Sequence, residues 1–332
     1  MKKMEWGISF VLLCCMLLHS CSKGEVLHPV ERYGQLSVHG TFLVDQKGNK
    51  IQLRGISSHG LQWYGKYANR NVLQWLRDDW NIDVWRSALY LTEGGYIQQR
   101  ALKQRVIDSI EAAIDLGLYV VVDWHVLREQ SPMVYKEDAK AFFSEIAEKY
   151  GMYPNIIYEI CNEPNGKDVT WKDVIKPYAE ELIDCIRAYD PDNIIIVGTP
   201  NWSQDVDIAA SDPITGYNNI MYTLHFYAGS HGKELQEKAK RAISNGIPIF
   251  VTEWGTTMDS GSGGPFIEKS KEWLSFLDKY SISWINWSLN NKGEDSGILV
   301  FNADRDARGG WTEKELSASG KFIRSILRSK RK

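Results

Sequence analysis

Residues 156–166 read Ile-Ile-Tyr-Glu-Ile-Cys-Asn-Glu-Pro-Asn-Gly, an apolar run that stops at polar residues. The run predicts a buried strand, and Pro164 cannot donate to a strand ladder, so the strand does not continue there as a central one. Glu163 is therefore expected just past the carboxyl end of a buried strand, where a carboxylate is a candidate catalytic group. A single carboxylate rarely performs catalysis alone, so a partner is expected elsewhere in the chain.

Similar apolar runs recur along the chain, and helical patterns separate them. Strand-like runs occupy residues 51–55, 82–86, 118–123, 156–161, 193–198, 220–225, 248–252 and 283–287. Helical patterns occupy residues 71–80, 102–116, 139–150, 175–189, 234–244, 266–280 and 315–327, but no clear long helix lies within 199–220. Strands that alternate with helices predict βαβ units and a parallel sheet. Eight such strands in one chain of 332 residues predict an α/β fold, a single (β/α)8 TIM barrel.

The segment before the first strand predicts an addition to the barrel. Residues 34–38 and 41–45 have the pattern of a short β-hairpin, which we expect to cap the barrel bottom. The alternative fold is an open doubly wound sheet, which usually carries a glycine-rich phosphate-binding turn after its first strand. Residues 54–60, Arg-Gly-Ile-Ser-Ser-His-Gly, do not match that fingerprint.

The N-terminus has the pattern of an export signal. A basic start at residues 2–3 precedes an apolar run at 7–18 that is too short to span a bilayer as a stable helix. Leu-His-Ser-Cys at 18–21 resembles a bacterial lipoprotein box in which Cys21 is lipidated; a simple secretory signal cleaved nearby is the alternative. We therefore expect a signal peptide at 1–21, a tether at 22–32 and one domain at 33–328. The expected location is the bacterial cell envelope, at the outer membrane or cell surface.

Composition narrows the class of partner. The formal net charge of −3 argues against nucleic acid. Thirteen Trp and sixteen Tyr fit either a sugar-binding site or a large aromatic core. Within the expected domain, Cys161 and Cys185 fit small buried thiols, and their spacing indicates neither a disulfide framework nor a metal site.

Polar and aromatic residues follow nearly every predicted strand. The carboxyl ends of barrel strands meet at one face, and that face carries the chemistry in this fold. Two carboxylates stand out there, Glu163 after the fourth strand and Glu253 after the seventh. Either one alone fits an ion pair or a helix cap, whereas both together, with Arg86 and several histidines, predict catalysis. The residues at these strand ends include His59, Trp63, Tyr64, Arg86, Tyr90, Asp123, His125, Asn162, Trp202, His225, Tyr227, Trp287 and Lys292.

Paired carboxylates without a metal-binding cluster suggest glycoside hydrolysis. One acid protonates the leaving oxygen, and the other attacks the sugar carbon or activates water. The two groups lie about 5–5.5 Å apart in retaining enzymes and about 6.5–9.5 Å apart in inverting ones.

Several motifs resemble glycoside hydrolase family 5, the cellulase family of clan A, and its bacterial endo-β-1,4-glucanases in particular. The likeness covers residues 33–328. The matching segments are LRGISSHGLQWYG (53–65), LRDDWNIDVWR (76–86), VVVDWHVL (120–127), NIIYEICNEPNG (155–166), YTLHFYAGSHG (222–232), IFVTEWG (249–255), WINWSLNNK (284–292) and GGWTEKELSASGKFIRSIL (309–327).

The resemblance assigns roles to these residues and implies retention of configuration. Glu163 corresponds to the general acid/base and Glu253 to the nucleophile. A nearby cation and a donor would keep Glu253 ionised, while Glu163 needs a raised pKa. The other implied catalytic residues are Arg86, His125, Asn162, His225 and Tyr227. The implied substrate-binding residues are His59, Trp63, Tyr64, Tyr90, Trp202, Trp287 and Lys292.

The activity implied is that of a retaining endo-β-1,4-glucanase acting on cellulose or mixed-linkage β-glucan through a glycosyl-enzyme intermediate. The same chemistry on mannan, xylan or xyloglucan is the alternative. A glycan-binding protein on an inactive barrel would need the loss of a catalytic glutamate, and both are present. No metal or organic cofactor is implied, because both chemical steps use carboxylates and water. The expected partners are a β-glucan polysaccharide or oligosaccharide and, through the lipid alone, a membrane; a monomer is expected.

Overall fold

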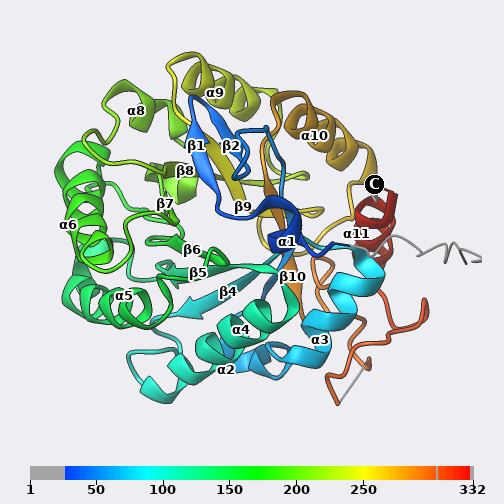
Figure 1. Ribbon diagram of the computed structural model, residues 1–332. Helices are drawn as coiled ribbons and strands as arrows, with labels where there is room; N and C mark the ends of the chain where they lie inside the picture. The colour runs from blue at the N-terminus through cyan, green and yellow to red at the C-terminus, as the bar shows by residue number, and fades with distance from the viewer. Residues whose placement is uncertain (1–26, 304–305, 330–332) are drawn as a thin grey trace, which may run out of the picture.

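Eight parallel strands close into a barrel in the computed structural model, which describes residues 27–303 and 306–329 (Figure 1). The order around the barrel is β10-β3-β4-β5-β6-β7-β8-β9, so the last strand pairs with the first. The predicted (β/α)8 barrel is thus confirmed. The strands are β3 (Arg54–Ser58), β4 (Val84–Tyr90), β5 (Tyr119–His125), β6 (Ile156–Glu159), β7 (Ile194–Val197), β8 (Ile220–Tyr227), β9 (Ile249–Gly255) and β10 (Trp284–Leu289).

Helices surround the barrel and cover the outward-facing strand residues, which form one large apolar cluster with them. Between β7 and β8 only two short helices occur, in agreement with the missing helical pattern at 199–220. The main helices are α3 (Arg70–Trp75), α4 (Lys103–Leu116), α5 (Lys136–Tyr150), α6 (Lys176–Arg187), α7 (Pro200–Ser203), α8 (Val206–Ser211), α9 (Lys233–Ser244), α10 (Ile267–Tyr280) and α11 (Ala318–Ser329). Shorter turns are α2 (Leu61–Tyr64), η1 (Gly65–Tyr67), η2 (Leu76–Trp80), η3 (Arg100–Leu102), η4 (Pro132–Tyr135) and η5 (Trp171–Ile175).

The lower half of the barrel interior is apolar and is closed by a hairpin. Strands β1 (Ser37–His39) and β2 (Phe42–Val44) pair antiparallel, and Figure 1 shows them across one end of the barrel. Leu36 and Leu43 pack against inward-facing strand residues such as Tyr119. The Tyr119 hydroxyl also donates to the Gly34 carbonyl at 2.6 Å. The expected cap at the barrel bottom is therefore confirmed.

Above this apolar layer the barrel interior becomes polar. Side chains alternate between the two faces of a strand, so a residue two positions after an inward-facing one also faces inward. Arg86 stands two positions after Val84, and Glu159 stands two positions after Ile157. The inward-facing polar layer is fully buried and consists of Ser57, Arg86, Asp123, Glu159, Thr223 and Thr252. These polar groups lie beneath the mouth of the barrel.

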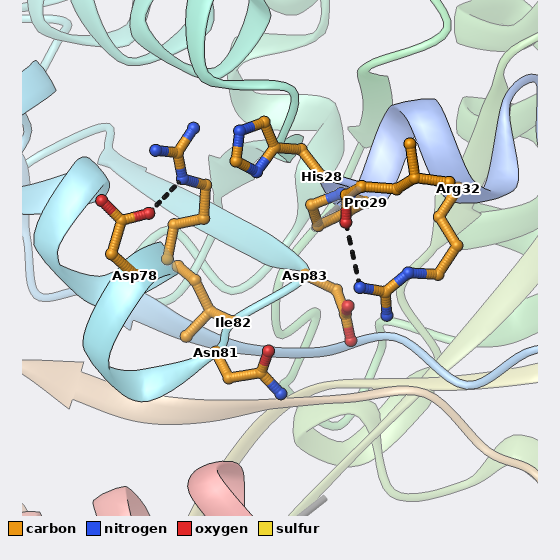
Figure 2. Close-up of a pocket in the computed structure, with 9 residues that line it drawn as sticks. His28, Pro29, Arg32, Asp78, Asn81, Ile82 and Asp83 are labelled. Carbon is orange, nitrogen blue, oxygen red and sulfur yellow. Dashed lines mark hydrogen bonds and ion pairs between the residues drawn. The ribbon is translucent and has the colours of Figure 1, made fainter. Parts of the chain in front are cut away.

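The chain enters the fold earlier than the predicted boundary at residue 33. Helix α1 (Pro29–Tyr33) overlaps the segment predicted as a tether, and the Val30 amide donates to the Gly117 carbonyl at 2.9 Å. Pro29 is buried, and together with this hydrogen bond it explains why the segment packs against the barrel. A cleft opens beside α1, lined among others by His28, Arg32 and Asp83 (Figure 2). The predicted signal peptide, Cys21 and residues 22–26 lie outside the described residues. Across the described ranges, no helix has the length and apolar character needed to cross a bilayer.

Candidate active site

The two predicted carboxylates meet at the carboxyl-terminal mouth of the barrel. Glu253 belongs to β9, and Glu163 follows the last residue of β6 by four positions. The Glu163 amide donates to the Val126 carbonyl at 3.1 Å, which fixes its backbone beside β5. One carboxylate oxygen of Glu163 and one of Glu253 lie within 4.8 Å of each other. So close an approach of the two oxygens suits a retaining pair, whose carboxyl groups lie about 5–5.5 Å apart.

Both oxygens of Glu253 are held by donors. The Tyr227 hydroxyl donates to Oε1 at 2.6 Å, and Arg86 Nη1 donates to Oε2 at 3.0 Å. Burial alone would raise the pKa of Glu253, but the positive charges of His225 and Arg86 and the Tyr227 hydrogen bond hold it below its ordinary value. Glu253 is therefore arranged to remain ionised.

Glu163 is arranged in the opposite way. Its Oε1 lies 2.9 Å from His225 Nδ1. Burial raises the pKa of Glu163; the hydrogen bond with His225 opposes that rise, and the charge of Glu253 adds to it, so the pKa is raised overall. Glu163 thus holds a proton more readily than Glu253 does, and two carboxyl groups in such different states can divide acid and nucleophile roles.

Arg86 organises the buried charges below this pair. Its Nε donates to Glu159 Oε2 at 2.7 Å, and its Nη2 donates to Asn162 Oδ1 at 2.6 Å. Nη2 also lies 3.0 Å from Asp123 Oδ2, which in turn lies 2.6 Å from His125 Nδ1. Burial and the charge of Arg86 lower the pKa of His125 to about 3, so its ring is neutral and acts as a hydrogen-bonding group. One guanidinium from β4 therefore fixes residues from β5, the β6 segment and β9.

Aromatic rings form one wall of the mouth. The Tyr90 ring stacks on His125 with centroids 4.0 Å apart, and His125 stacks on Trp287 at 5.5 Å. The rings of His59 and Trp287 lie 5.0 Å apart. Flat rings with polar edges present the surface that a sugar ring packs against, so this wall is a candidate sugar-binding surface.

The wall continues outward to the rim. Trp63 lies 5.2 Å from Tyr90 and is 47% exposed, while Tyr64 lies 5.1 Å from His59. Lys292 is part of the same region, because its Nζ lies 2.7 Å from Glu294 Oε2 and Glu294 Oε1 lies 3.8 Å from His59 Nε2. The structure therefore groups these predicted binding residues on one side of the carboxylates.

Trp202 stands apart from that wall, next to Glu163. Its amide donates to the Pro164 carbonyl at 3.1 Å, and its side chain is 44% exposed. Asn201, Trp202 and Ser203 all have left-handed backbones, with φ of 59°, 56° and 55°. The Ser203 hydroxyl donates to the Asn162 carbonyl at 2.6 Å. An unusual turn thus fixes the Trp202 backbone next to the residue that follows Glu163.

Three potential metal-ligating groups converge here as well. One donor atom each from Glu163, His225 and Glu253 lie within 4.8 Å of one another. Both Glu253 oxygens already accept hydrogen bonds, and His225 Nδ1 already contacts Glu163. A guanidinium beside Glu253 also disfavours a second cation. The donor set therefore fits a paired acid and nucleophile better than a metal centre.

Sequence reasoning missed several polar residues of the site. Asp123 was noted only as a strand end, and Glu159 only as a member of an apolar run, yet both contact Arg86. Thr252 was read as part of a motif, yet its hydroxyl lies 2.9 Å from His225 Nε2. Their two-residue spacing from inward-facing apolar residues was the signal that could have identified them. Cys21, the predicted lipidation site, lies outside the described residues.

Comparisons with known proteins agree with this fold and identify the family. The model of the family Cellulase (glycosyl hydrolase family 5) matches residues 44–293. Endoglucanase 5 of Pectobacterium carotovorum subsp. carotovorum is 52% identical over 328 residues, a match that covers 99% of this chain and 64% of that protein. Endoglucanase N of Pectobacterium atrosepticum is 51% identical over 328 residues, covering 99% of this chain and 72% of that protein. These relatives are thus longer than the chain.

Solved structures give the same result. A Cytophaga hutchinsonii structure superposes with a TM-score of 0.88 at 46% identity, covering 92% of this chain and 97% of that one. The catalytic domain of Thermobifida fusca endoglucanase Cel5A in complex with cellotetraose gives a TM-score of 0.86 at 37% identity, covering 91% of this chain and 100% of that one. The barrel and its carboxylate pair define a member of the (β/α)8 glycosidases. The chain belongs to glycosyl hydrolase family 5, the cellulase family.

Proposed function

We propose that this chain is a retaining endo-β-1,4-glucanase that hydrolyses internal bonds of cellulose or mixed-linkage β-glucan. The observation that carries the proposal is the Glu163–Glu253 pair. One carboxylate oxygen of each residue lies within 4.8 Å of the other, and the pKa of Glu163 is raised while that of Glu253 is lowered. The names of the similar Pectobacterium endoglucanases support a glucan as substrate.

In the first step, Glu253 attacks the anomeric carbon while Glu163 protonates the departing glycosidic oxygen. A sugar ester of Glu253 forms, and the aglycone leaves as an alcohol. Arg86 and Tyr227 hold the attacking carboxylate in one orientation, which reduces the ordering that the transition state requires. In this proposal Asn162, which Arg86 holds in position, would contact the sugar hydroxyl next to the anomeric carbon.

In the second step, Glu163 acts as a base on water, which attacks the sugar ester and releases Glu253. The negative charge of Glu253 is absent while the ester exists, so the charge that helped to keep the proton on Glu163 is absent too. Two inversions at one carbon give net retention.

Aromatic residues on both sides of the carboxylates define the proposed sugar subsites. Trp287, Tyr90, His59 and Trp63 would bind the sugars on the glycone side, with Tyr64 and Lys292 at the rim. Trp202, beside Glu163, would stack on the aglycone side. Sugar subsites on both sides of the cleavage point would suit internal cutting of a polymer.

The direct test is release of reducing ends from carboxymethylcellulose. Wild type should be active. Glu253→Gln should lose activity by about 10³-fold or more, because without the Glu253 carboxylate the covalent glycosyl-enzyme intermediate cannot form. Glu272→Gln, an exposed position on α10, is the matched control and should keep wild-type activity. Equal activity of wild type and Glu253→Gln would overturn the proposal.

A panel of polymers tests the substrate. Rates on carboxymethylcellulose, mixed-linkage glucan, mannan, xylan and xyloglucan should be highest on the first two. A faster fall in viscosity than in an exo-acting control, at equal reducing-end release, would support internal cutting. Higher rates on mannan, xylan or xyloglucan would keep the chemistry and change the polymer.

We propose that the enzyme is exported and attached to the bacterial envelope through a lipid on Cys21. We also propose that it acts as a monomer. The support is the sequence of residues 1–21. Metabolic labelling with a radioactive fatty acid should label wild type and not Cys21→Ser. Labelling of both variants, or of neither, would overturn the lipid attachment.

A further inference from the structure

A buried polar cluster lies behind His225, on the side away from Glu163. Thr252 Oγ1 lies 2.9 Å from His225 Nε2, 2.6 Å from Glu159 Oε1 and 2.5 Å from Thr223 Oγ1. Glu159, Thr223 and Thr252 are all fully buried. Buried polar groups need hydrogen-bond partners, so the direction of each hydrogen bond in this cluster can be worked out.

Glu159 sets the first direction. Its two oxygens accept from Arg86 Nε at 2.7 Å and Arg86 Nη2 at 3.2 Å. Burial alone would raise the pKa of Glu159, but the charge of Arg86 holds it at about 2. An ionised carboxylate can only accept, so the single hydroxyl proton of Thr252 points to Glu159.

The proton on His225 follows from this. With its own proton committed, Thr252 Oγ1 can only accept from its other two neighbours. Thr223 accepts from the Thr252 amide at 3.2 Å, and its hydroxyl is free to donate to Thr252 Oγ1. The remaining lone pair of Thr252 faces His225 Nε2, which must therefore carry a hydrogen. Every donor and acceptor of Thr252 is then used.

We propose that Thr252 is a positioning residue that keeps a proton on His225 Nε2 and thereby keeps one proton in the hydrogen bond between His225 Nδ1 and Glu163 Oε1. If that shared proton left while Nε2 kept its own, an imidazole lone pair would face a carboxylate at 2.9 Å. That arrangement is repulsive, so the pair retains its proton to higher pH. The inference rests on the proposed function of Glu163 as general acid.

Without Thr252, neutral His225 could move its remaining proton from Nε2 to Nδ1. Nδ1 would then donate to ionised Glu163, and loss of the acid proton would become easier. Thr252 prevents this exchange of tautomers by offering Nε2 an acceptor only. Burial would lower the pKa of His225, but its contacts with Glu159 and Glu163 raise it to about 9. This fits a proton on Nε2 together with one proton shared between Nδ1 and Glu163.

Other charged groups also act on this pair. The carboxylates that face His225 are Glu159 and Glu163 from the β6 segment and Glu253 from β9. The other charged or titratable groups that influence the pair electrostatically are Asp123 and His125 from β5 and Arg86 from β4. These groups are unchanged in a Thr252 variant, so a comparison of variants isolates the Thr252 hydroxyl. In the reaction, the proton of the pair passes through Glu163 to the glycosidic oxygen as that oxygen takes the electron pair of the breaking bond.

The first experiment is the pH profile of kcat/KM for Thr252→Val and Thr252→Ser. Valine keeps the shape and removes the hydroxyl, so its basic limb should move to lower pH by about one unit, the equivalent of one net hydrogen bond. Serine keeps the hydroxyl and should restore the wild-type limb. A basic limb that valine leaves in place, or that serine moves as far as valine does, would overturn the inference.

The second experiment does not depend on activity. Long-range ¹H–¹⁵N spectra of protein labelled at histidine nitrogens report which ring nitrogen carries hydrogen. In wild type, Nε2 of His225 should stay protonated from about pH 5 to 8, the range in which histidines ordinarily titrate. An unprotonated Nε2 in wild type would overturn the inference even if Thr252→Val does not fold. Wild type that cuts no glucan would contradict the proposed function instead.

Discussion

Tyr227 places its hydroxyl 2.6 Å from Glu253 Oε1, opposite the guanidinium of Arg86 on the other oxygen. Tyr227→Phe removes one donor to the ionised carboxylate and should raise the pKa of Glu253. Because Glu253 must be ionised to attack, the acid limb of kcat should move to higher pH by about one unit, as expected for a hydrogen bond to a charged group. The measurement is the pH dependence of reducing-end release.

Tyr178→Phe is the matched control for that experiment. Its hydroxyl is buried and donates to the Ile160 carbonyl at 2.8 Å, outside the barrel interior. This variant loses a buried hydrogen bond without touching Glu253, so its stability should fall while its acid limb stays in place. Equal acid limbs in Tyr227→Phe and wild type would show that the charges of His225 and Arg86 keep Glu253 ionised without the Tyr227 hydroxyl.

Arg86→Met should destabilise the fold by about 3–5 kcal/mol at neutral pH, because removing one member of a buried charge cluster leaves the others uncompensated. Glu159, Asp123 and Glu253 would lose their common partner. The deficit should shrink as pH falls, since protons then neutralise these carboxyl groups. Urea unfolding at neutral and acidic pH measures both effects.

Arg70→Met provides the comparison. Arg70 pairs with Asp115, and both side chains are more than half exposed, at 54% and 57%. Such a surface pair contributes about 0–1 kcal/mol. If both arginine variants lost the same small amount of stability, the buried charge network around Arg86 would not stabilise the fold as predicted.

The short distance between Glu163 and Glu253 predicts the stereochemistry of the first product. A retaining pair acting on a β-linked oligosaccharide should release the β-anomer before mutarotation. Proton NMR of the fresh hydrolysate of a soluble cello-oligosaccharide distinguishes the two anomeric signals. The α-anomer as first product would contradict the double-displacement mechanism.

Asp83 predicts a pH dependence of stability at the opposite end of the barrel. It lies in the cleft beside α1 (Figure 2), and burial raises its pKa from 3.8 to about 6. The folded state therefore binds a proton more tightly than the unfolded state, so stability falls as pH rises through this range. Asp83→Asn should match wild type near pH 4 and exceed it above pH 6 by up to about 3 kcal/mol.

Asp78→Asn tests whether the effect belongs to Asp83. Asp78 lines the same cleft, but it is 50% exposed and pairs with Arg77 at 2.7 Å (Figure 2). Its replacement should change the free energy of unfolding by less than about 1 kcal/mol at either pH. If Asp78→Asn stabilised the protein at high pH and Asp83→Asn did not, the pH dependence of stability would not come from Asp83.

The sequence predicted the barrel because alternating strands and helices leave a strong apolar pattern, and the hairpin for the same reason. It placed the first barrel strand at 51–55, whereas β3 spans Arg54–Ser58. Ile51 and Leu53 are apolar because they belong to the bottom layer. Ser57 is polar because it faces the interior near Arg86, and the Ser58 hydroxyl accepts a hydrogen bond from the Ala88 amide. A strand that ends in polar residues facing a site therefore continues beyond its apolar run, and its end cannot be predicted from that run.

Candidate site residues were predictable where they follow a strand or sit in a motif. Glu159 lies inside the motif at 155–166, yet the motif does not reveal its role. That role depends on Arg86, which lies 73 positions earlier in the chain and meets Glu159 only in the closed barrel. The placement of Trp202 depends on left-handed backbone at three successive residues, none of them glycine. Sequence alone gives no sign of that conformation, because glycine is the residue that usually marks it.

The pairing of β10 with β3 closes the barrel, and Arg86 reaches across to a carboxylate 167 residues later in the chain. No continuous half of the protein contains the reacting pair together with its guanidinium. Catalytic activity should therefore appear only at the last stage of refolding, after the secondary structure has formed. Catalytic activity therefore reports that folding is complete. Two separately expressed halves should regain activity only when they assemble.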